Sequence, residues 1–277
     1  MARPRLATLG LASVVLAYWI AGPPPGDLAR LGHLVAGSLL ALASGSILNQ
    51  VLERGPDARM RRTADRPLPA GRVTPAAALV VGTAFLFAGL AELSVGVNGL
   101  TAACAALGIA IYLGFYTPLK RRTSFSTVVG AVPGAVPVLM GWAAARGSLD
   151  VDAWTLFAIL FLWQLPHFLA IAWMYRADYE RAGFRMLPIE GPDGASTARQ
   201  VALYGVALLP VSLLPSVVGL SGPLYFFGAL ALGLAYVVFG LLLGAQRTGV
   251  AARRLLRASV AYLPLLLGLM AVDRVAF

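Results

Sequence analysis

The sequence predicts an all-α, polytopic integral membrane protein, and three observations support this prediction. Hydrophobic residues make up 59% of the 277 positions and charged residues only 12%, a balance typical of membrane proteins. Runs of about 16 to 23 apolar residues recur along the whole chain, and such runs are long enough to cross a bilayer as helices. None of them shows the two-residue alternation of a barrel strand, so helices are the structure that satisfies the backbone in lipid.

Nine spans follow from the apolar runs, taken in order along the chain. The first, at 6–21, is preceded by Arg3 and Arg5 and ends at the Pro-rich turn 22–26. Because no small-x-small cleavage site precedes that turn, we expect this helix to be retained and not removed as a signal peptide. We place the other spans at 31–49, 75–97, 99–117, 126–145, 153–174, 200–220, 223–245 and 255–272. Together they are predicted to form a single transmembrane domain over residues 1–277.

The basic residues set the predicted orientation. Of the 22 lysines and arginines, all but Arg30, Arg146 and Arg274 fall before the first span or around the loops after spans two, four, six and eight. This asymmetry places the N-terminus in the cytoplasm and the C-terminus outside. Orientation and attraction to the anionic lipid bilayer account for the net charge of +10, so no nucleic-acid partner is expected. Cys104 is the single cysteine, which excludes an internal disulfide and a cysteine-based metal site.

The segment 49–72 concentrates charge of both signs, with six arginines and three carboxylates. Asn49, Glu53 and Asp57 are spaced four residues apart, so on a helix they form one polar stripe. Pro56 would clash with a carbonyl of the preceding turn, so we expect the helix to end there and Asp57 to turn back toward the other two. Oxygen ligands clustered at a helix end suit Mg²⁺, which also takes water and phosphate oxygens.

Basic side chains in the same segment favour an anion site beside the metal. Arg59, Arg62 and Arg66 are spaced three and four residues apart, and a guanidinium group binds phosphate in a bidentate manner. Carboxylates for a metal and arginines for an anion together indicate a metal-diphosphate site. The alternative interpretation is a cytoplasmic loop that is basic for reasons of topology, with its acids paired locally.

Two further cytoplasmic loops repeat the pattern. The loop after span four carries Tyr116, then the only lysine, Lys120, and then Arg121. The loop after span six carries Asp178 among arginines. Topology predicts the bases on this face of the membrane but not the acids. We therefore expect the three loops to contribute to one active-site rim.

The set of motifs resembles the UbiA superfamily of intramembrane prenyltransferases and, within it, the protohaem IX farnesyltransferase family. The polar motif that begins at Asn49 carries the broader resemblance, and later stretches carry the narrower one. Those stretches are Val97-Asn98-x-Leu100-Thr101, Tyr116-Thr117-x-Leu119-Lys120-Arg121-Arg122-Thr123, Gly134-Ala135-x-Pro137 with Gly141-Trp142, Trp163-Gln164-x-Pro166-His167-Phe168, and Asp178-Tyr179-x2-Ala182-Gly183-x2-Met186-Leu187-Pro188. The chain departs from the family pattern at Ser126, at Val138 and after Asp178, where no second aspartate follows four residues on.

The resemblance implies a bundle of nine helices around a central cavity. It also implies a Mg²⁺-dependent transfer of the farnesyl group from farnesyl diphosphate to a vinyl group of haem b, giving haem O. The implied catalytic and metal-binding residues are Asn49, Glu53, Asp57 and Asp178, and the implied diphosphate-binding residues are Arg62, Arg66, Lys120, Arg121 and Tyr116. The implied location is the cell inner membrane with the site facing the cytoplasm, and a haem A synthase or an oxidase-assembly factor is an implied partner.

His167 and Trp163 are the candidate haem contacts. A histidine inside a membrane span is expected to serve a site, and haem iron is an obvious partner. The alternative is a histidine that is hydrogen-bonded to a neighbouring helix.

Two other functions of the protein stay open. One is prenyl transfer to an aromatic acid or quinone precursor at the same diphosphate site. The other is transport of an anionic amphiphile, for which the acids of segment 49–72 have no evident use.

Overall fold

The computed structural model describes residues 4–274, and within that range the regular secondary structure is helical, with one isolated bridge between Ser221 and Arg274. The chain divides into two compact units. The first comprises Met1–Leu149 with Ala177–Phe184, and the second comprises Asp150–Arg176 with Arg185–Phe277.

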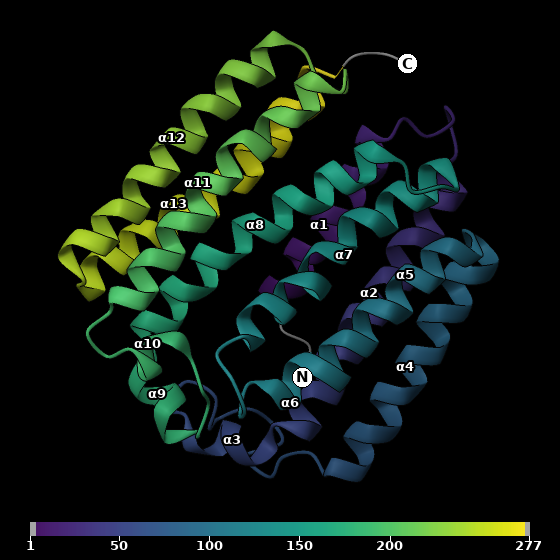
Figure 1. Ribbon diagram of the computed structural model, residues 1–277. Helices are drawn as coiled ribbons and strands as arrows, with labels where there is room; N and C mark the ends of the chain where they lie inside the picture. The colour runs from purple at the N-terminus through teal and green to yellow at the C-terminus, as the bar shows by residue number, and fades with distance from the viewer. Residues whose placement is uncertain (1–3, 275–277) are drawn as a thin grey trace. The chain divides into compact units, whose positions relative to one another are not determined.

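The first unit is built on two pairs of packed helices. Its elements are α1 (Pro4–Ile20), α2 (Leu28–Leu52), α3 (Arg54–Arg59), α4 (Pro75–Gly96), α5 (Gly99–Ala110), the π-helix η1 (Ile111–Tyr116), α6 (Thr117–Leu119), α7 (Ser126–Arg146) and most of α9 (Arg176–Arg181). Helix α2 packs along α4, and α1 packs along α7 (Figure 1). Small residues allow both approaches. A Cβ atom added at Gly89 of α4 would lie 2.9 Å from the backbone nitrogen of Ala41, and one added at Gly141 of α7 would collide with the carbonyl of Val14.

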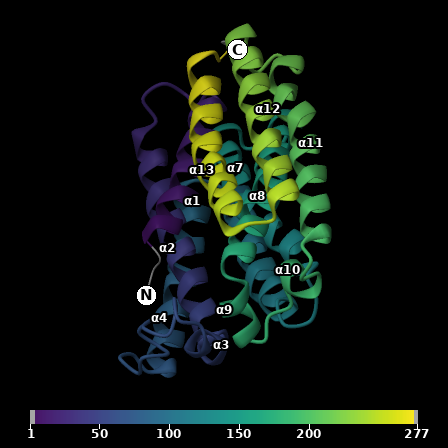
Figure 2. The same cartoon turned by 90° about the vertical axis from the view of Figure 1, so that its left-hand side faces the viewer.

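The second unit consists of long helices that pack in sequence. Its elements are α8 (Val151–Met174), α10 (Leu187–Glu190), α11 (Ala195–Val217), α12 (Pro223–Gln246) and α13 (Gly249–Val272). Helix α11 packs on α8 and on α12, and α13 packs on α12 and on α8. Figure 2 shows α11, α12 and α13 running side by side.

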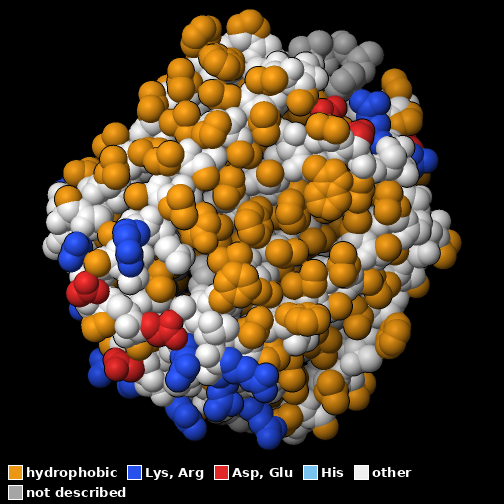
Figure 3. Space-filling view, in the orientation of Figure 1, with side chains coloured by type: hydrophobic (Ala, Val, Ile, Leu, Met, Phe, Trp, Pro, Cys, Tyr) orange, Lys and Arg blue, Asp and Glu red, His pale blue; other side chains and the backbone are white. Residues whose placement is uncertain are grey.

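Eight helical segments within residues 4–274 are long and apolar enough to cross a membrane, and they correspond to the second to ninth predicted spans. The first predicted span corresponds to α1, whose apolar stretch Thr8–Ile20 is shorter. The all-α, polytopic prediction is therefore confirmed. Figure 3 shows hydrophobic side chains over most of the visible face, with lysine and arginine side chains gathered where Figure 1 draws α3 and α6.

Helix α13 differs from the prediction in a way that moves two charges. Helix α13 begins at Gly249, about two turns before the predicted start of its span at 255, because the Thr248 side chain caps it by accepting the backbone N–H of Ala251 at 3.2 Å. Arg253 and Arg254 therefore lie on the helix and not in the loop before it.

Candidate active site

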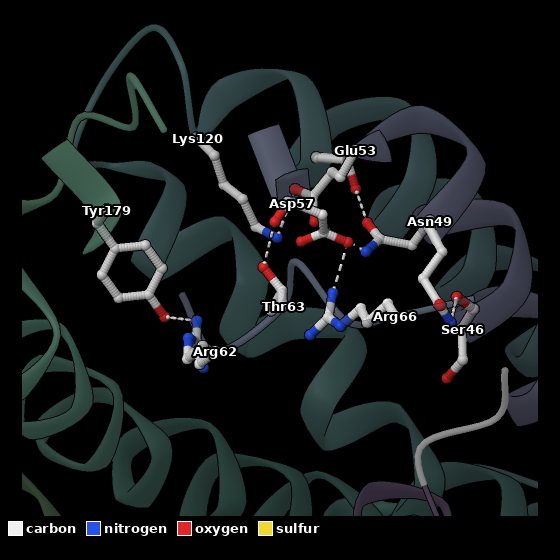
Figure 4. Close-up of polar contacts among 11 residues, drawn as sticks. Ser46, Asn49, Glu53, Asp57, Arg62, Thr63, Arg66, Lys120 and Tyr179 are labelled. Atoms are coloured by element: carbon white, nitrogen blue, oxygen red, sulfur yellow. Dashed lines mark hydrogen bonds and ion pairs between the residues drawn. The ribbon is translucent and has the colours of Figure 1, made fainter. Parts of the chain in front are cut away.

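The predicted helix break after Asn49 is present. Helix α2 ends at Leu52, and the short helix α3 begins at Arg54 with Pro56 inside it. The backbone N–H of Glu53 still donates to the carbonyl of Asn49 at 2.9 Å, and the N–H of Asp57 donates to the carbonyl of Glu53 at 2.8 Å. All three side chains are buried, and Figure 4 shows them gathered at the end of α2. The polar stripe predicted from their spacing therefore exists.

Basic side chains neutralise the two buried carboxylates of this group. Glu53 Oε1 lies 2.8 Å from Lys120 Nζ, and Asp57 Oδ2 lies 2.6 Å from Arg66 NH1 (Figure 4). Such pairing is required because an isolated charge in a buried setting is costly. Burial lowers the pKa of the Lys120 amine, but Tyr116 and Glu53 raise it more, so that its pKa lies above the usual value and Lys120 stays charged at neutral pH.

One oxygen of this group lacks a donor. Asp57 Oδ1 is fully buried and has no hydrogen-bond partner, a situation that costs about 1–3 kcal/mol when nothing compensates it. A divalent cation with carboxylate ligands would satisfy it, so the residues present fit a Mg²⁺ ion. Among the described residues, however, no three His, Cys, Asp or Glu side chains are grouped closely enough to hold a metal by themselves. A metal here would depend on one or two carboxylates, as Mg²⁺ usually does.

Asp178 and Arg62 also lie in the first unit, and each contacts a residue other than Glu53 or Asp57. Arg62 donates from NH2 to the hydroxyl of Tyr179 at 2.7 Å and lies over that ring (Figure 4). Asp178 is buried and pairs with Arg181 on its own helix, α9. The structure thus places Asp178 in the same unit as Glu53 but paired with a different residue. Within residues 4–274, Asp178 is not part of a group of three His, Cys, Asp or Glu side chains that could hold a metal.

Of the site residues predicted in the segment from Tyr116 to Arg121, Lys120 contacts the buried carboxylates directly. Lys120 Nζ pairs with Glu53 and lies 4.2 Å from the centroid of the Tyr116 ring. Tyr116 in turn stacks on Tyr112 at 5.7 Å. Arg121 is exposed, so Lys120 and Tyr116 are brought together and Arg121 is left at the surface.

Two buried threonines were not singled out from the sequence. Thr63 donates from Oγ1 to the carbonyl of Asp57 at 2.7 Å, which closes the turn after α3. Thr117 donates from Oγ1 to Asn49 Oδ1 at 2.8 Å. Both lie inside motifs that carry the family resemblance, but spacing alone gave no reason to prefer them over other threonines.

His167 and Trp163 are both fixed to Ser259 within the second unit. Trp163 Nε1 donates to the carbonyl of Ser259 at 2.8 Å, and His167 Nδ1 lies 2.6 Å from Ser259 Oγ. The two rings stack with centroids 5.2 Å apart. His167 therefore makes the hydrogen bond to a neighbouring helix, α13, that was the alternative to haem contact.

The hydroxyl of Ser259 contacts both His167 and the backbone of its own helix. Ser259 Oγ lies 2.7 Å from the carbonyl of Leu256 and 2.6 Å from His167 Nδ1. Within the described residues Nε2 of His167 has no hydrogen-bond partner, so it is the ring nitrogen that is left available for a ligand.

Comparison with known proteins identifies the family. A model of the UbiA prenyltransferase family matches residues 10–263, across both units. The chain belongs to the UbiA prenyltransferase family. It is 50% identical to a protoheme IX farnesyltransferase of Solibacter usitatus over 99% of this chain and 97% of that one. It is 44% identical to a protein of the same name from Salinibacter ruber over 99% and 96%.

Several solved structures share the fold. A digeranylgeranylglyceryl phosphate synthase superposes with a TM-score of 0.83 at 16% identity, covering 99% of this chain and 95% of that one. A UbiA homolog from Aeropyrum pernix K1 gives 0.77 at 19% identity, covering 98% of each. A UbiA homolog from Archaeoglobus fulgidus bound to GPP and Mg²⁺ gives 0.67 at 13% identity, covering 96% and 97%. The chain is thus a multi-pass membrane prenyltransferase.

Proposed function

We propose that this chain transfers the farnesyl group of farnesyl diphosphate to a vinyl group of haem b, giving haem O. We infer the acceptor, haem b, from one observation. The chain is 50% identical, over nearly the full length of both chains, to a relative named protoheme IX farnesyltransferase. The polar group at the end of α2 supports the donor, because it combines buried carboxylates with cations that can bind phosphate.

The chain's own residues have distinct tasks in this proposal. Glu53 and Asp57 are the carboxylates that would hold Mg²⁺, and Asp57 Oδ1 is the oxygen that has no other partner. Arg62, Arg66 and Lys120 bind the diphosphate oxygens and stabilise the charge of the leaving group. The bound Mg²⁺ would supply further neutralisation of the diphosphate. Asp178, Arg121 and Tyr116 remain proposed members of the same rim.

The proposed reaction balances without an oxidant. The allylic carbon–oxygen bond breaks, and the diphosphate leaves with the electron pair. The vinyl π electrons form the new carbon–carbon bond, and water captures the resulting porphyrin-side cation and then loses a proton. The apolar span interiors protect the carbocation from earlier capture by water. His167, whose Nε2 makes no hydrogen bond within the described residues, is the proposed contact for haem iron or a propionate, with Trp163 stacked beside it.

The location and partners are also proposed. The basic loops favour a plasma membrane protein whose site faces the cytoplasm. A haem A synthase or an oxidase-assembly factor would consume or accept the product. We further propose that both units act as one prenyltransferase domain, since one family match runs through them.

An acceptor competition tests the proposal. Membranes that contain the protein are incubated with farnesyl diphosphate, Mg²⁺ and equal amounts of haem b and para-hydroxybenzoate, and the products are separated by chromatography. We expect haem O and no prenylated benzoate. Prenylated benzoate alone would assign the chain to the aromatic-acid prenyltransferases. Uptake of farnesyl diphosphate without diphosphate release would indicate a transporter.

A further inference from the structure

Thr117 connects the π-helix η1 to the polar group at the end of α2. It follows η1 directly and is buried. Its Oγ1 lies 2.8 Å from Asn49 Oδ1, and Asn49 Nδ2 lies 2.9 Å from Glu53 Oε2. The other oxygen of Glu53 pairs with Lys120 at 2.8 Å. These residues form a continuous chain of hydrogen bonds that ends on a carboxylate proposed to hold the metal.

The directions of the bonds between Lys120, Glu53 and Asn49 follow from what each group can donate. Lys120 has only protons to donate, so Glu53 accepts from it as a carboxylate. Glu53 Oε2 must also accept, which requires the amide nitrogen of Asn49 on that side and its carbonyl oxygen on the side of Thr117. Asn49 Oδ1 can then only accept from the hydroxyl of Thr117, and the carbonyl of Tyr112 is a second acceptor at the same distance of 2.8 Å.

The π-helix explains how the carbonyl of Tyr112 can do without the hydroxyl proton of Thr117. The backbone N–H of Thr117 donates to the carbonyl of Tyr112, five residues back. This bond satisfies Tyr112 and leaves the Thr117 hydroxyl available for Asn49. A π-helical turn inside an α-helical span is uncommon and is often associated with a functional site. Here it precedes both Thr117 and Lys120, the two residues that contact the end of α2.

From this geometry we infer that Thr117 is a positioning residue for the metal-diphosphate site. Its hydroxyl holds the Asn49 side chain in place, and the Asn49 amide in turn holds the Glu53 carboxylate. Without that hydroxyl the buried oxygen of Asn49 loses its donor, so the side chain can leave Glu53 for a conformer in which that oxygen has a partner. The inference deepens the proposed function and rests on it. Loss of such an outer contact typically costs 10- to 100-fold in metal affinity or activity.

The test compares four substitutions in detergent-purified protein. Thr117→Val keeps the shape and removes the hydroxyl. Thr117→Ala removes it without requiring more space, so the test does not depend on one variant folding. Thr117→Ser keeps the hydroxyl, and Thr83→Val on α4 is the control. Each variant is measured for the Mg²⁺ concentration that gives half-maximal turnover. The increase in melting temperature produced by Mg²⁺ with inorganic diphosphate is measured as well.

We expect Thr117→Val and Thr117→Ala to raise the Mg²⁺ requirement about 10- to 100-fold and to shrink the thermal shift, with KM for haem b unchanged. Thr117→Ser should recover most of both. In an Asn49→Ala background, Thr117→Val should have no further effect.

The inference is overturned by wild-type behaviour of the Val and Ala variants, by a Ser variant no better than Ala, or by an undiminished effect in the Asn49→Ala background. Should the wild type fail to make haem O, the proposed function fails, while the thermal shifts still decide the role of Thr117.

Discussion

At the scale of single residues, the site is organised by charge compensation. Glu53 and Asp57 are buried at the end of a membrane helix and are each paired with a cation from elsewhere in the sequence. A carboxylate in that setting without a partner would be strongly disfavoured. Lys120 and Arg66 supply that compensation and keep the two carboxyl groups together at the end of α2. The same cations are suited to bind the substrate phosphates.

Asp57→Asn should lower turnover by roughly 10²-fold or more, because one charged oxygen of the metal-diphosphate site is lost from the transition state. Glu53→Gln should act in the same direction. Haem binding should remain normal in both variants, since the carboxylates serve the other substrate. Asp65→Asn is the matched control, because Asp65 lies in the same segment but is exposed. Near-normal turnover of Asp57→Asn at saturating Mg²⁺ would remove Asp57 from the site.

His167→Ala should weaken haem binding and change the haem absorption spectrum, because it removes Nε2, the ring nitrogen that the contact between Nδ1 and Ser259 leaves available. Affinity for farnesyl diphosphate should be nearly unchanged. The control is His33→Ala, since His33 is the other histidine of the chain and pairs instead with Glu92 at 2.7 Å. A purely structural histidine predicts a lower melting temperature with unchanged haem affinity and spectrum, and that result would exclude the contact.

At the scale of elements, two interruptions of regular helix create the site. The break after α2 was predictable, because Pro56 cannot continue the helix and the spacing of Asn49, Glu53 and Asp57 marks one face. The π-helix was not predictable, because Ile111–Tyr116 is an apolar run like many others and contains no residue that marks an irregular turn. For the same reason the sequence suggested Lys120 as a phosphate ligand but did not show that it pairs with Glu53.

Gly130→Ala tests whether packing holds η1 in place. A Cβ atom at Gly130 of α7 would lie 2.5 Å from the Tyr116 ring, so the ring must move. Such overpacking costs about 1–3 kcal/mol, and it would displace the ring against which Lys120 lies. We expect a lower melting temperature and a higher KM for farnesyl diphosphate. Gly114→Ala is the control within η1, because no atom lies within 4 Å of its added Cβ. Equal behaviour of the two variants would contradict this role for the packing.

At the scale of the whole molecule, the sequence predicted the membrane spans well and their ends less well. Long apolar runs leave few alternatives in lipid, so the helices of both units were identified. The early start of α13 depends on a cap at Thr248 that a hydropathy pattern does not contain. The acceptor could be suggested only by resemblance, because porphyrin and quinone precursors demand similar apolar surroundings.

The orientation remains a prediction that labelling can test. In a Cys104→Ala background, a cysteine at Arg72 should react with an impermeant thiol reagent only from the cytoplasmic side, and one at Gly147 only from outside. The physical reason is the concentration of basic residues around the loops after even-numbered spans. The opposite labelling pattern would reverse the topology and would move the site to the other face of the membrane.

The most direct test of the central claim follows both products of one reaction. Purified protein is given haem b and farnesyl diphosphate, with and without Mg²⁺, and haem species and free diphosphate are quantified in the same samples. We predict that haem O and diphosphate appear in equal amounts and only with Mg²⁺. Release of diphosphate while haem b stays unmodified, or no release at all, would contradict farnesyl transfer to haem.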